Sequence, residues 1–513
     1  MLTTLTAPAF AKEWYIEEGD ITVRAGETEG TNKVSQGENP EVEDTNTVIT
    51  NSDKDKASSN TVTIEAKDKD DKVEVTLKDV NIDTSSRSEA AVSVTGEGNT
   101  NIELDGDNAL KSDIYSSGIS SSGSLTISGG ENDSLTAQGG SGADGIYSSG
   151  SLTISGGTVT ANGGSGGGGD GGDGIWSSGG VTISGGSTVT ANGGDGKDDY
   201  GGDGIRSDSG DVTISGGSTV TANGGNGGNV SGDGIRSDSG DVTISGGTVK
   251  AAGGDSKDGY GGDGIRSGGV TISGGTVNAA GGNGGKVGGY GICSFARVAI
   301  SGGTVNAAGG NGKNSNGGSD GIISNDIDLS GSLELTAKAG RPNGKAISWA
   351  GHELDLDTIK DKLGPGAKVT ATDANGETKQ VSSPIPRPVE PEEPEPVIPE
   401  ESSSSSDGGS ATPSAPASPL PGLTVTDKDG QRISYTSTQS GNTLTVCVGR
   451  LTASLRASLA TLRQLRAEGI DTITFQTILC STTLSVDELL AMGGEDAEAV
   501  LTHRLTASSL TVG

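Results

Sequence analysis

The sequence has few aromatic side chains, few histidines and few cysteines. Aromatic residues make up 3% and hydrophobic residues 30% of the 513 positions, too few for a large globular core but enough for a thin one of Val, Ile, Leu and Ala. The two histidines, His352 and His503, lie far apart in the sequence, which argues against a histidine-based metal or catalytic site. Of three cysteines, Cys447 and Cys480 could pair and Cys293 is single.

Long apolar runs and an excess of positive charge are also missing. No run approaches 18 apolar residues, so we expect no membrane span. Lys and Arg total 35 against 68 Asp and Glu, which gives a net charge of −33. Nucleic acid is therefore not expected as a partner, because neutralising phosphates requires patches of Lys and Arg.

A short phrase recurs through the middle of the chain. Each copy begins with glycine followed by isoleucine, and we call this pair the anchor. Successive anchors are 27 to 30 residues apart, a fixed period that indicates a solenoid. The anchor glycines are Gly118, Gly145, Gly174, Gly204, Gly234, Gly264, Gly291 and Gly321.

Each copy contains short phrases typical of strands. Val212–Ser215 and Thr219–Ala222 alternate large aliphatic with small residues, the period of a half-buried strand, and glycine corners separate them. The pattern predicts an all-β right-handed parallel β-helix with about 30 residues per coil, whose three sheets stack equivalent strands about 4.8 Å apart.

One coil cannot fold alone. Its expected core residues each contribute about 1.5–3 kcal/mol on burial, whereas ordering the coil costs about 1–2 kcal/mol per residue. Stacked coils share a core and hydrogen-bond ladders. The same comparison predicts that glycine-rich stretches such as Asn162–Gly172 are mobile unless something binds them. The core residues expected in one coil are Ile205, Val212, Ile214 and Val220.

Four regions follow from the composition. Residues 1–11 end in Ala9-Phe10-Ala11 and resemble the tail of a secretory signal without its basic start, which predicts a secreted or cell-surface protein. Residues 12–382 are expected to form the β-helix with capping coils at both ends. Residues 383–422 are a Pro/Glu/Ser-rich linker.

Residues 423–513 are expected to form a small α+β domain of unknown role. Strands are predicted at Thr443–Val448, Thr472–Thr477 and Leu505–Val512. Leucines on one face predict an amphipathic helix over Ser454–Glu468, which Gly469 could end.

One column of residues is predicted to point outward, because it follows the inward isoleucine of each anchor. Aromatic rings stack on sugar rings and arginine offers a planar fork for carboxylates. We therefore expect a linear stripe that binds a polysaccharide or cell-surface glycan. The alternative is a solvated ladder in which Asp208 and Asp238, two residues after their arginines, neutralise the charge; Arg266 lacks such a partner. The candidate binding residues are Tyr147, Trp176, Arg206, Arg236 and Arg266.

A second column, one of aspartates, precedes the anchors. Neighbouring carboxylates about 5 Å apart repel by roughly 3 kcal/mol at an effective dielectric constant of 20, so the column needs compensation. Side-chain capping of the Gly-Ile turn or bound calcium would supply it, and we favour capping slightly. Gly193–Tyr200 also fits a calcium-repeat pattern, but that pattern works as tandem nonapeptides, and here it recurs only imperfectly, once per coil. The candidate calcium ligands are Asp144, Asp173, Asp203, Asp233 and Asp263.

The phrases at residues 233–249 (DGIRSDSGDVTISGGTV) and 73–108 resemble secreted bacterial right-handed β-helix proteins described as carbohydrate-binding domains. That family is related in shape to the pectate lyases, and the resemblance covers about residues 60–340. It implies binding of cellulose-like or acidic polysaccharides, with calcium in some members. The glycine-rich loops of this chain are longer than is usual there.

The sequence therefore predicts a non-catalytic extracellular carbohydrate-binding or adhesive protein. A structural adhesin or spacer that displays the C-terminal domain is the first alternative. A calcium-dependent polysaccharide lyase is the second, with Arg266 beside Asp263 as its only candidate base. Near-identical coils argue against the lyase, because an active site usually interrupts a repeat.

Overall fold

The computed structural model describes residues 12–384, except 29 and 316, and most of residues 423–512. In the second stretch, residues 428–430, 434, 441, 449–452, 468, 478–480, 487–488, 491–497 and 505–506 are not described. The expected leader at 1–11, most of the linker and the Cys447–Cys480 pairing therefore lie outside the described residues. The chain divides into two compact units, residues 1–390 and 391–513.

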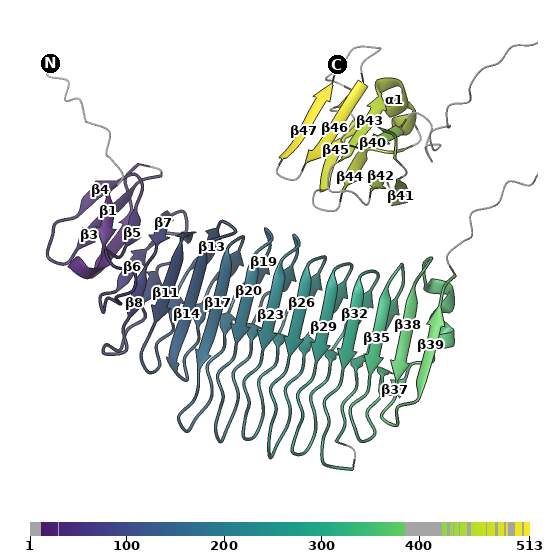
Figure 1. Cartoon of the computed structure of the whole chain (residues 1–513), viewed down its shortest axis with the longest axis horizontal. Helices are drawn as coiled ribbons and strands as arrows, with labels where there is room; N and C mark the ends of the chain where they lie inside the picture. The colour runs from purple at the N-terminus through teal and green to yellow at the C-terminus, as the bar shows by residue number, and fades with distance from the viewer. Residues whose placement is uncertain are drawn as a thin grey trace, which may run out of the picture. The chain divides into compact units, whose positions relative to one another are not determined.

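The first unit is a right-handed parallel β-helix with three long sheets (Figure 1). Each coil adds one strand to each sheet, as the three recurring phrases predicted. We name the sheets anchor, middle and third, in the order in which a coil visits them. Residue pairing is in strict register, so Ile205 lies over Ile235 and Val212 over Val242.

The anchor sheet has 15 strands, which begin at the Gly-Ile pairs in the central coils. Its strands are β4 (Val42–Asp44), β3 (Asn32–Gln36), β2 (Ile21–Ala25), β6 (Val62–Glu65), β9 (Val92–Thr95), β12 (Ile119–Ser121), β15 (Ile146–Ser148), β18 (Ile175–Ser177), β21 (Ile205–Ser207), β24 (Ile235–Ser237), β27 (Ile265–Ser267), β30 (Ile292–Ser294), β33 (Ile322–Ser324), β36 (Ile347–Trp349) and β37 (His352–Glu353).

The middle sheet has 12 strands, formed in the central coils by the phrase that ends in Ser-Gly-Gly. Its strands are β1 (Glu13–Tyr15), β5 (Val48–Thr50), β7 (Lys72–Lys78), β10 (Asn99–Asp105), β13 (Ser124–Gly129), β16 (Ser151–Ile154), β19 (Gly180–Ile183), β22 (Val212–Ile214), β25 (Val242–Ile244), β28 (Val270–Ile272), β31 (Arg297–Ile300) and β34 (Asp326–Leu329).

The third sheet also has 12 strands, and the glycine-rich loops follow its central strands. Its strands are β8 (Asn81–Asp83), β11 (Asp107–Lys111), β14 (Ser134–Ser141), β17 (Thr158–Gly164), β20 (Thr188–Asn192), β23 (Thr219–Asn223), β26 (Thr248–Ala252), β29 (Thr276–Ala280), β32 (Thr304–Ala308), β35 (Glu334–Lys338), β38 (Lys368–Thr372) and β39 (Thr378–Ser382).

The core is a thin aliphatic column, as expected. Ile205, Val212, Ile214 and Val220 of one coil are each at most 1% exposed, and the same positions are buried in the neighbouring coils. Every coil thus closes the core of the next, which explains why the unit needs so few aromatic residues.

Antiparallel strands cap both ends of the helix. At the N-terminal end β3 pairs antiparallel with β2 and β4, and Trp14 is buried with its Nε1 donating to Asp44 (2.7 Å). At the C-terminal end β39 pairs antiparallel with β38, and the 3-10 helix η2 (Leu356–Lys362) buries Leu356 and Ile359. These caps close the core and end the parallel edges that would otherwise recruit further strands.

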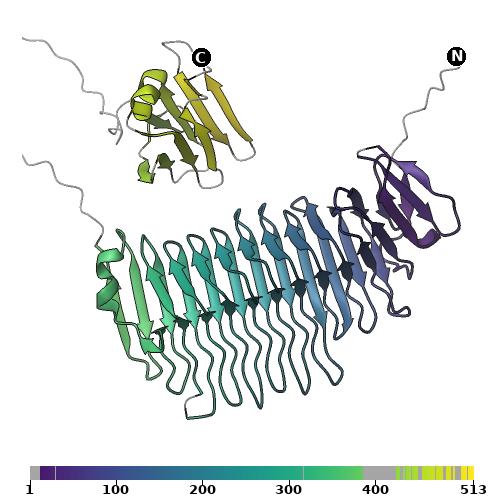
Figure 2. The same cartoon turned by 180° about the vertical axis from the view of Figure 1, so that it is seen from behind.

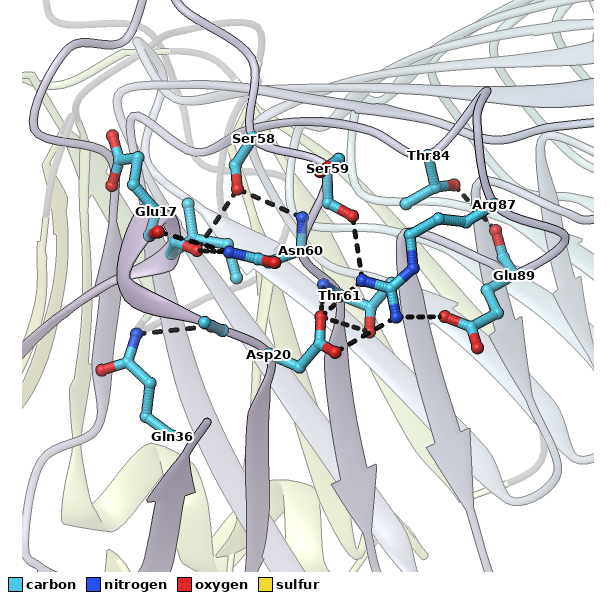
Figure 3. Close-up of polar contacts among 12 residues, drawn as sticks. Glu17, Asp20, Gln36, Ser58, Ser59, Asn60, Thr61, Thr84, Arg87 and Glu89 are labelled. Atoms are coloured by element: carbon cyan, nitrogen blue, oxygen red, sulfur yellow. Dashed lines mark hydrogen bonds and ion pairs between the residues drawn. The ribbon is translucent and has the colours of Figure 1, made fainter. Parts of the chain in front are cut away.

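A charged network fastens the N-terminal cap to the coils behind it (Figure 3). Arg87 donates to both oxygens of Asp20 (2.8 and 3.1 Å) and lies 2.7 Å from Glu89. Asp20 also accepts the backbone N–H of Thr61 (2.8 Å). The 3-10 helix η1 (Ile16–Glu18) precedes Asp20, and Asn60 donates to the carbonyl of Ile16 (2.9 Å).

The glycine-rich loops form a row of long stacked hairpins beside the third sheet (Figure 1). Their outgoing arms, such as residues 193–196, and their return arms, such as 201–204, make up what we call the glycine layer. Gly196 N–H donates to Asn226 of the next coil (2.8 Å), and Gly202 N–H donates across to Gly194 of its own loop (2.9 Å). Hydrogen bonds thus link the loops from coil to coil, which argues against the expectation that these stretches are mobile without a ligand.

The absence of side chains explains why the two arms pack so closely. A Cβ atom on Gly202 would lie 2.0 Å from the carbonyl oxygen of Gly172, and one on Gly193 would lie 1.9 Å from that of Gly202. Only glycine allows backbone to meet backbone at this distance. The prediction of mobility compared only the burial of apolar side chains with the cost of ordering the chain, and it left out these backbone hydrogen bonds.

The second unit, seen in yellow in Figure 2, contains two four-stranded sheets and the helix α1 (Leu459–Ala467). One sheet comprises β40 (Leu423–Thr426), β43 (Ala453–Ser458), β46 (Glu498–Arg504) and β47 (Ala507–Val512), and the other β41 (Thr436–Ser440), β42 (Thr443–Cys447), β44 (Thr472–Gln476) and β45 (Ser481–Ser485).

The helix α1 (Leu459–Ala467) is shorter than predicted. The prediction of a helix over Ser454–Glu468 is wrong at its start, because residues 454–458 belong to β43, where buried and half-buried positions alternate. Leu455 therefore contributes to the core from a strand, whereas Leu459, Leu462 and Leu465 do so from the helix. Gly469 follows the helix with φ 89°, a conformation that ends helices readily.

Candidate functional site

The outward column of the anchor sheet has the composition that the sequence predicted. Strand pairing places Tyr147 beside Trp176, Trp176 beside Arg206, and the three arginines in succession. All five side chains are half-buried. The rings of Tyr147 and Trp176 meet edge to face with centroids 5.1 Å apart, and the guanidinium of Arg206 lies 5.1 Å from the centre of the Trp176 ring. Ring contacts thus join the column from Tyr147 to Arg206.

The first two arginines are engaged by aspartates. Arg206 lies 3.0 Å from Asp208 and 3.1 Å from Asp238 of the next coil. Arg236 lies 2.6 Å from Asp238 and 3.8 Å from Asp203. Pairing within the strand was expected, and the structure adds pairing between coils.

The third arginine has different neighbours. Arg266 lies 3.8 Å from Asp263 and 5.2 Å from the centre of the Phe295 ring. Phe295 follows the anchor isoleucine by three residues, the position that Asp208 and Asp238 hold in their coils. A half-exposed aromatic ring therefore replaces the carboxylate beside Arg266.

The aspartate column is buried and hydrogen-bonded from coil to coil. Each carboxylate accepts the backbone N–H of the equivalent residue in the following coil: Asp173 donates to Asp144 (2.7 Å), Asp233 to Asp203 (2.6 Å) and Asp263 to Asp233 (2.6 Å). Capping, the explanation that we favoured slightly, is present, but each side chain caps the turn of the next coil rather than its own.

Burial raises the pKa values of these carboxyls far above their usual range. Loss of hydration is the main cause, and it raises the pKa of Asp144 and of Asp263 to about 6. For Asp203 and Asp233 burial together with the next aspartate raises the pKa to about 7. The nearby arginines lower these pKa values but do not bring them back to the usual range of an aspartate.

The two columns border a shallow cavity of about 280 Å³. Its other side was not predicted from the sequence: the return arms of the loops supply Tyr200 and Val230 to the lining. Tyr200, Val230, Tyr260 and Val287 each precede an anchor isoleucine by five residues, so the repeat itself carried the signal. The side chains that matter here are those of Asp144, Asp170, Asp173, Asp203, Trp176, Arg206, Arg236, Tyr200 and Val230.

Calcium binding remains a prediction. Among the residues that the structure describes, no three His, Cys, Asp or Glu side chains cluster as ligands for a metal ion. In the stretch that fits the calcium-repeat pattern, Asp195 accepts the backbone N–H of Asn226 in the next coil (2.8 Å).

Cys293 is a free cysteine and occupies the arginine position one coil beyond Arg266. It is 7% exposed, and burial raises the pKa of its thiol to about 12. A protonated, buried thiol is a poor nucleophile.

Comparison with known proteins supports the same class of fold. A family model described as a beta helix repeat matches residues 152–175, 181–205, 242–265 and 270–292. Neither a curated protein nor a solved structure matches the chain. Among the described residues, no helix is long and apolar enough to cross a membrane.

Proposed function

We propose that this β-helix is a non-catalytic extracellular protein that binds a polysaccharide or cell-surface glycan along its outward column. One observation carries the proposal: Trp176, Arg206 and Arg236 line a single cavity, in register and half-buried. Aromatic rings and planar donors at the spacing of the coils suit an extended sugar chain, because the rise of about 4.8 Å per coil is close to the length of one sugar unit.

The test is a glycan array combined with pull-down on insoluble polysaccharides. Tyr147→Ala and Trp176→Ala should abolish binding that the wild type shows. Trp349→Ala is the matched control, because Trp349 is 51% exposed on the last coil and does not line the cavity. Binding that survives both variants of the outward column would contradict the proposal.

A spacer that displays the C-terminal domain is the second candidate. It is favoured by the pairing of Arg206 and Arg236 within the chain, which a purely structural ladder also requires. Failure to bind any glycan would favour this alternative.

Absence of catalysis is part of the proposal. The coils that line the cavity are nearly identical, and the coil that departs from the repeat places a buried thiol at the column. Polygalacturonate incubated with the protein and calcium should produce no unsaturated product absorbing in the ultraviolet. Its appearance would make the protein a lyase.

A further inference from the structure

The return arms of the loops carry a second exposed column. Residue pairing links Tyr200 to Val230, Val230 to Tyr260 and Tyr260 to Val287, one step per coil. Tyr200 is 48% exposed and Tyr260 is 46% exposed. Because Tyr200 and Val230 line the same cavity as Trp176, the groove has two walls that run along the helix axis.

Hydrogen bonds to the neighbouring coils also hold the second wall in place. Tyr200 N–H donates to Asp170 of the preceding coil (3.2 Å), and Gly201 N–H donates to the carbonyl of Val230 in the following coil (2.9 Å). Between Tyr200 and the anchor strand, the chain runs through glycines whose Cβ positions are filled by neighbouring backbone. The separation of the two walls is therefore fixed by the glycine layer.

The charges in the groove disfavour an anionic ligand. Four carboxyl groups line the cavity, Asp144, Asp170, Asp173 and Asp203, against two guanidinium groups, so an anion meets no free positive charge there even where the buried aspartates are partly protonated. Both guanidinium groups already lie within 3.1 Å of an aspartate. A sugar carboxylate would have to displace one of these partners and approach the remaining acids.

We propose that the groove takes an uncharged, extended glycan chain between its two walls, with Trp176 on one side and Tyr200 on the other. This inference rests on the proposed function and goes beyond it, since it adds the loop wall and excludes polyuronates. Sugar rings offer apolar faces to both aromatic walls, while their hydroxyls donate to the aspartates of the floor.

Affinity electrophoresis of the full chain tests both parts. Hydroxyethylcellulose and mannan serve as uncharged probes, polygalacturonate as the anionic probe and chitosan as the cationic probe, each at low and high salt. We expect retention by an uncharged probe, little affected by salt, and none by polygalacturonate. Tyr200→Ala should weaken binding at least about tenfold, as truncation of an aromatic anchor does, and Tyr200→Phe should retain it. Trp349→Ala is again the control, and thermal melts should show that every variant is folded.

The possible failures are distinguishable. No retention by any probe would overturn the proposed function and this inference together. Binding that is lost in Trp176→Ala but kept in Tyr200→Ala would leave the proposed function standing and refute the second wall. Preferential, salt-sensitive binding of polygalacturonate or of chitosan would refute the assignment to an uncharged glycan.

Discussion

At the scale of single residues, the aspartate column combines two opposed effects. Each buried carboxylate satisfies a backbone N–H of the next coil, with a hydrogen bond that is stronger when the acceptor is charged. Burial and the neighbouring aspartates oppose that charge. The column therefore stabilises the helix more when its carboxyls are protonated.

Asp233 should make the stability of the β-helix depend on pH. Its pKa is about 7 when folded against 3.8 ordinarily, so between about pH 4 and pH 7 the folded state binds more protons than the unfolded state. Stability is then present at low pH and falls as pH rises through 7. Asp233→Asn imitates the protonated form, so its melting temperature should exceed that of the wild type by a few degrees more at pH 8 than at pH 4.5.

Asp255→Asn is the matched control for this experiment. Asp255 accepts the same kind of bond from the next coil, from the N–H of Asn283 (2.6 Å), but it is exposed. Its substitution should leave the difference between pH 4.5 and pH 8 unchanged. Equal pH profiles for the wild type and Asp233→Asn would show that burial of the column does not disfavour its charge.

At the scale of elements, the glycine layer is the part of the β-helix whose order was not predicted from the sequence. Short phrases with a period of two predicted the strands, and their constant spacing predicted which side chains form columns. The same reasoning failed in the glycine layer, because glycine has no side-chain periodicity to read and its order comes from backbone hydrogen bonds. In the second unit, the predicted helix began too early, because Leu455 fits a helical face and a strand equally well. The pairing of Arg206 with Asp238 required the neighbouring coil, which one strand alone does not reveal.

The glycine layer should tolerate side chains at its tips and not between its arms. Gly193→Ala would place a methyl group 1.9 Å from the carbonyl oxygen of Gly202 on the opposite arm, a contact that backbone can relieve only by moving. We expect a loss of about 1–3 kcal/mol in the free energy of unfolding, the usual cost of overpacking. Gly168→Ala is the control, because no atom lies within 4 Å of its Cβ position. Thermal melts of the two variants should differ by several degrees, and equal melts would mean that the arms are not in contact in solution.

At the scale of the whole unit, the β-helix is a one-dimensional array closed by two caps. Each coil contacts chiefly the coils before and after it, so the stability is close to a sum of coil and interface terms. The caps are specific to their ends, since Arg87 joins Asp20 to the first coils and η2 covers the last. Central coils can therefore be added or removed without a change in either cap.

Deletion of a complete central coil should leave the fold intact. Removing residues 205–234 joins Gly204 to Ile235, so β24, β25 and β26 would pair with β18, β19 and β20 in the register that β21, β22 and β23 now use. Far-ultraviolet circular dichroism should retain its β signal, and the melting temperature should stay within a few degrees of the wild type. The deletion removes one coil, and a single interface of the same kind replaces the two interfaces that this coil made with its neighbours. Removing residues 205–219 instead leaves half a coil, brings the loop sequence of one repeat opposite the strands of another, and should abolish the cooperative transition. If both deletions unfold alike, the coil is not the unit of stability, and the groove cannot be a set of equivalent sites, one per coil.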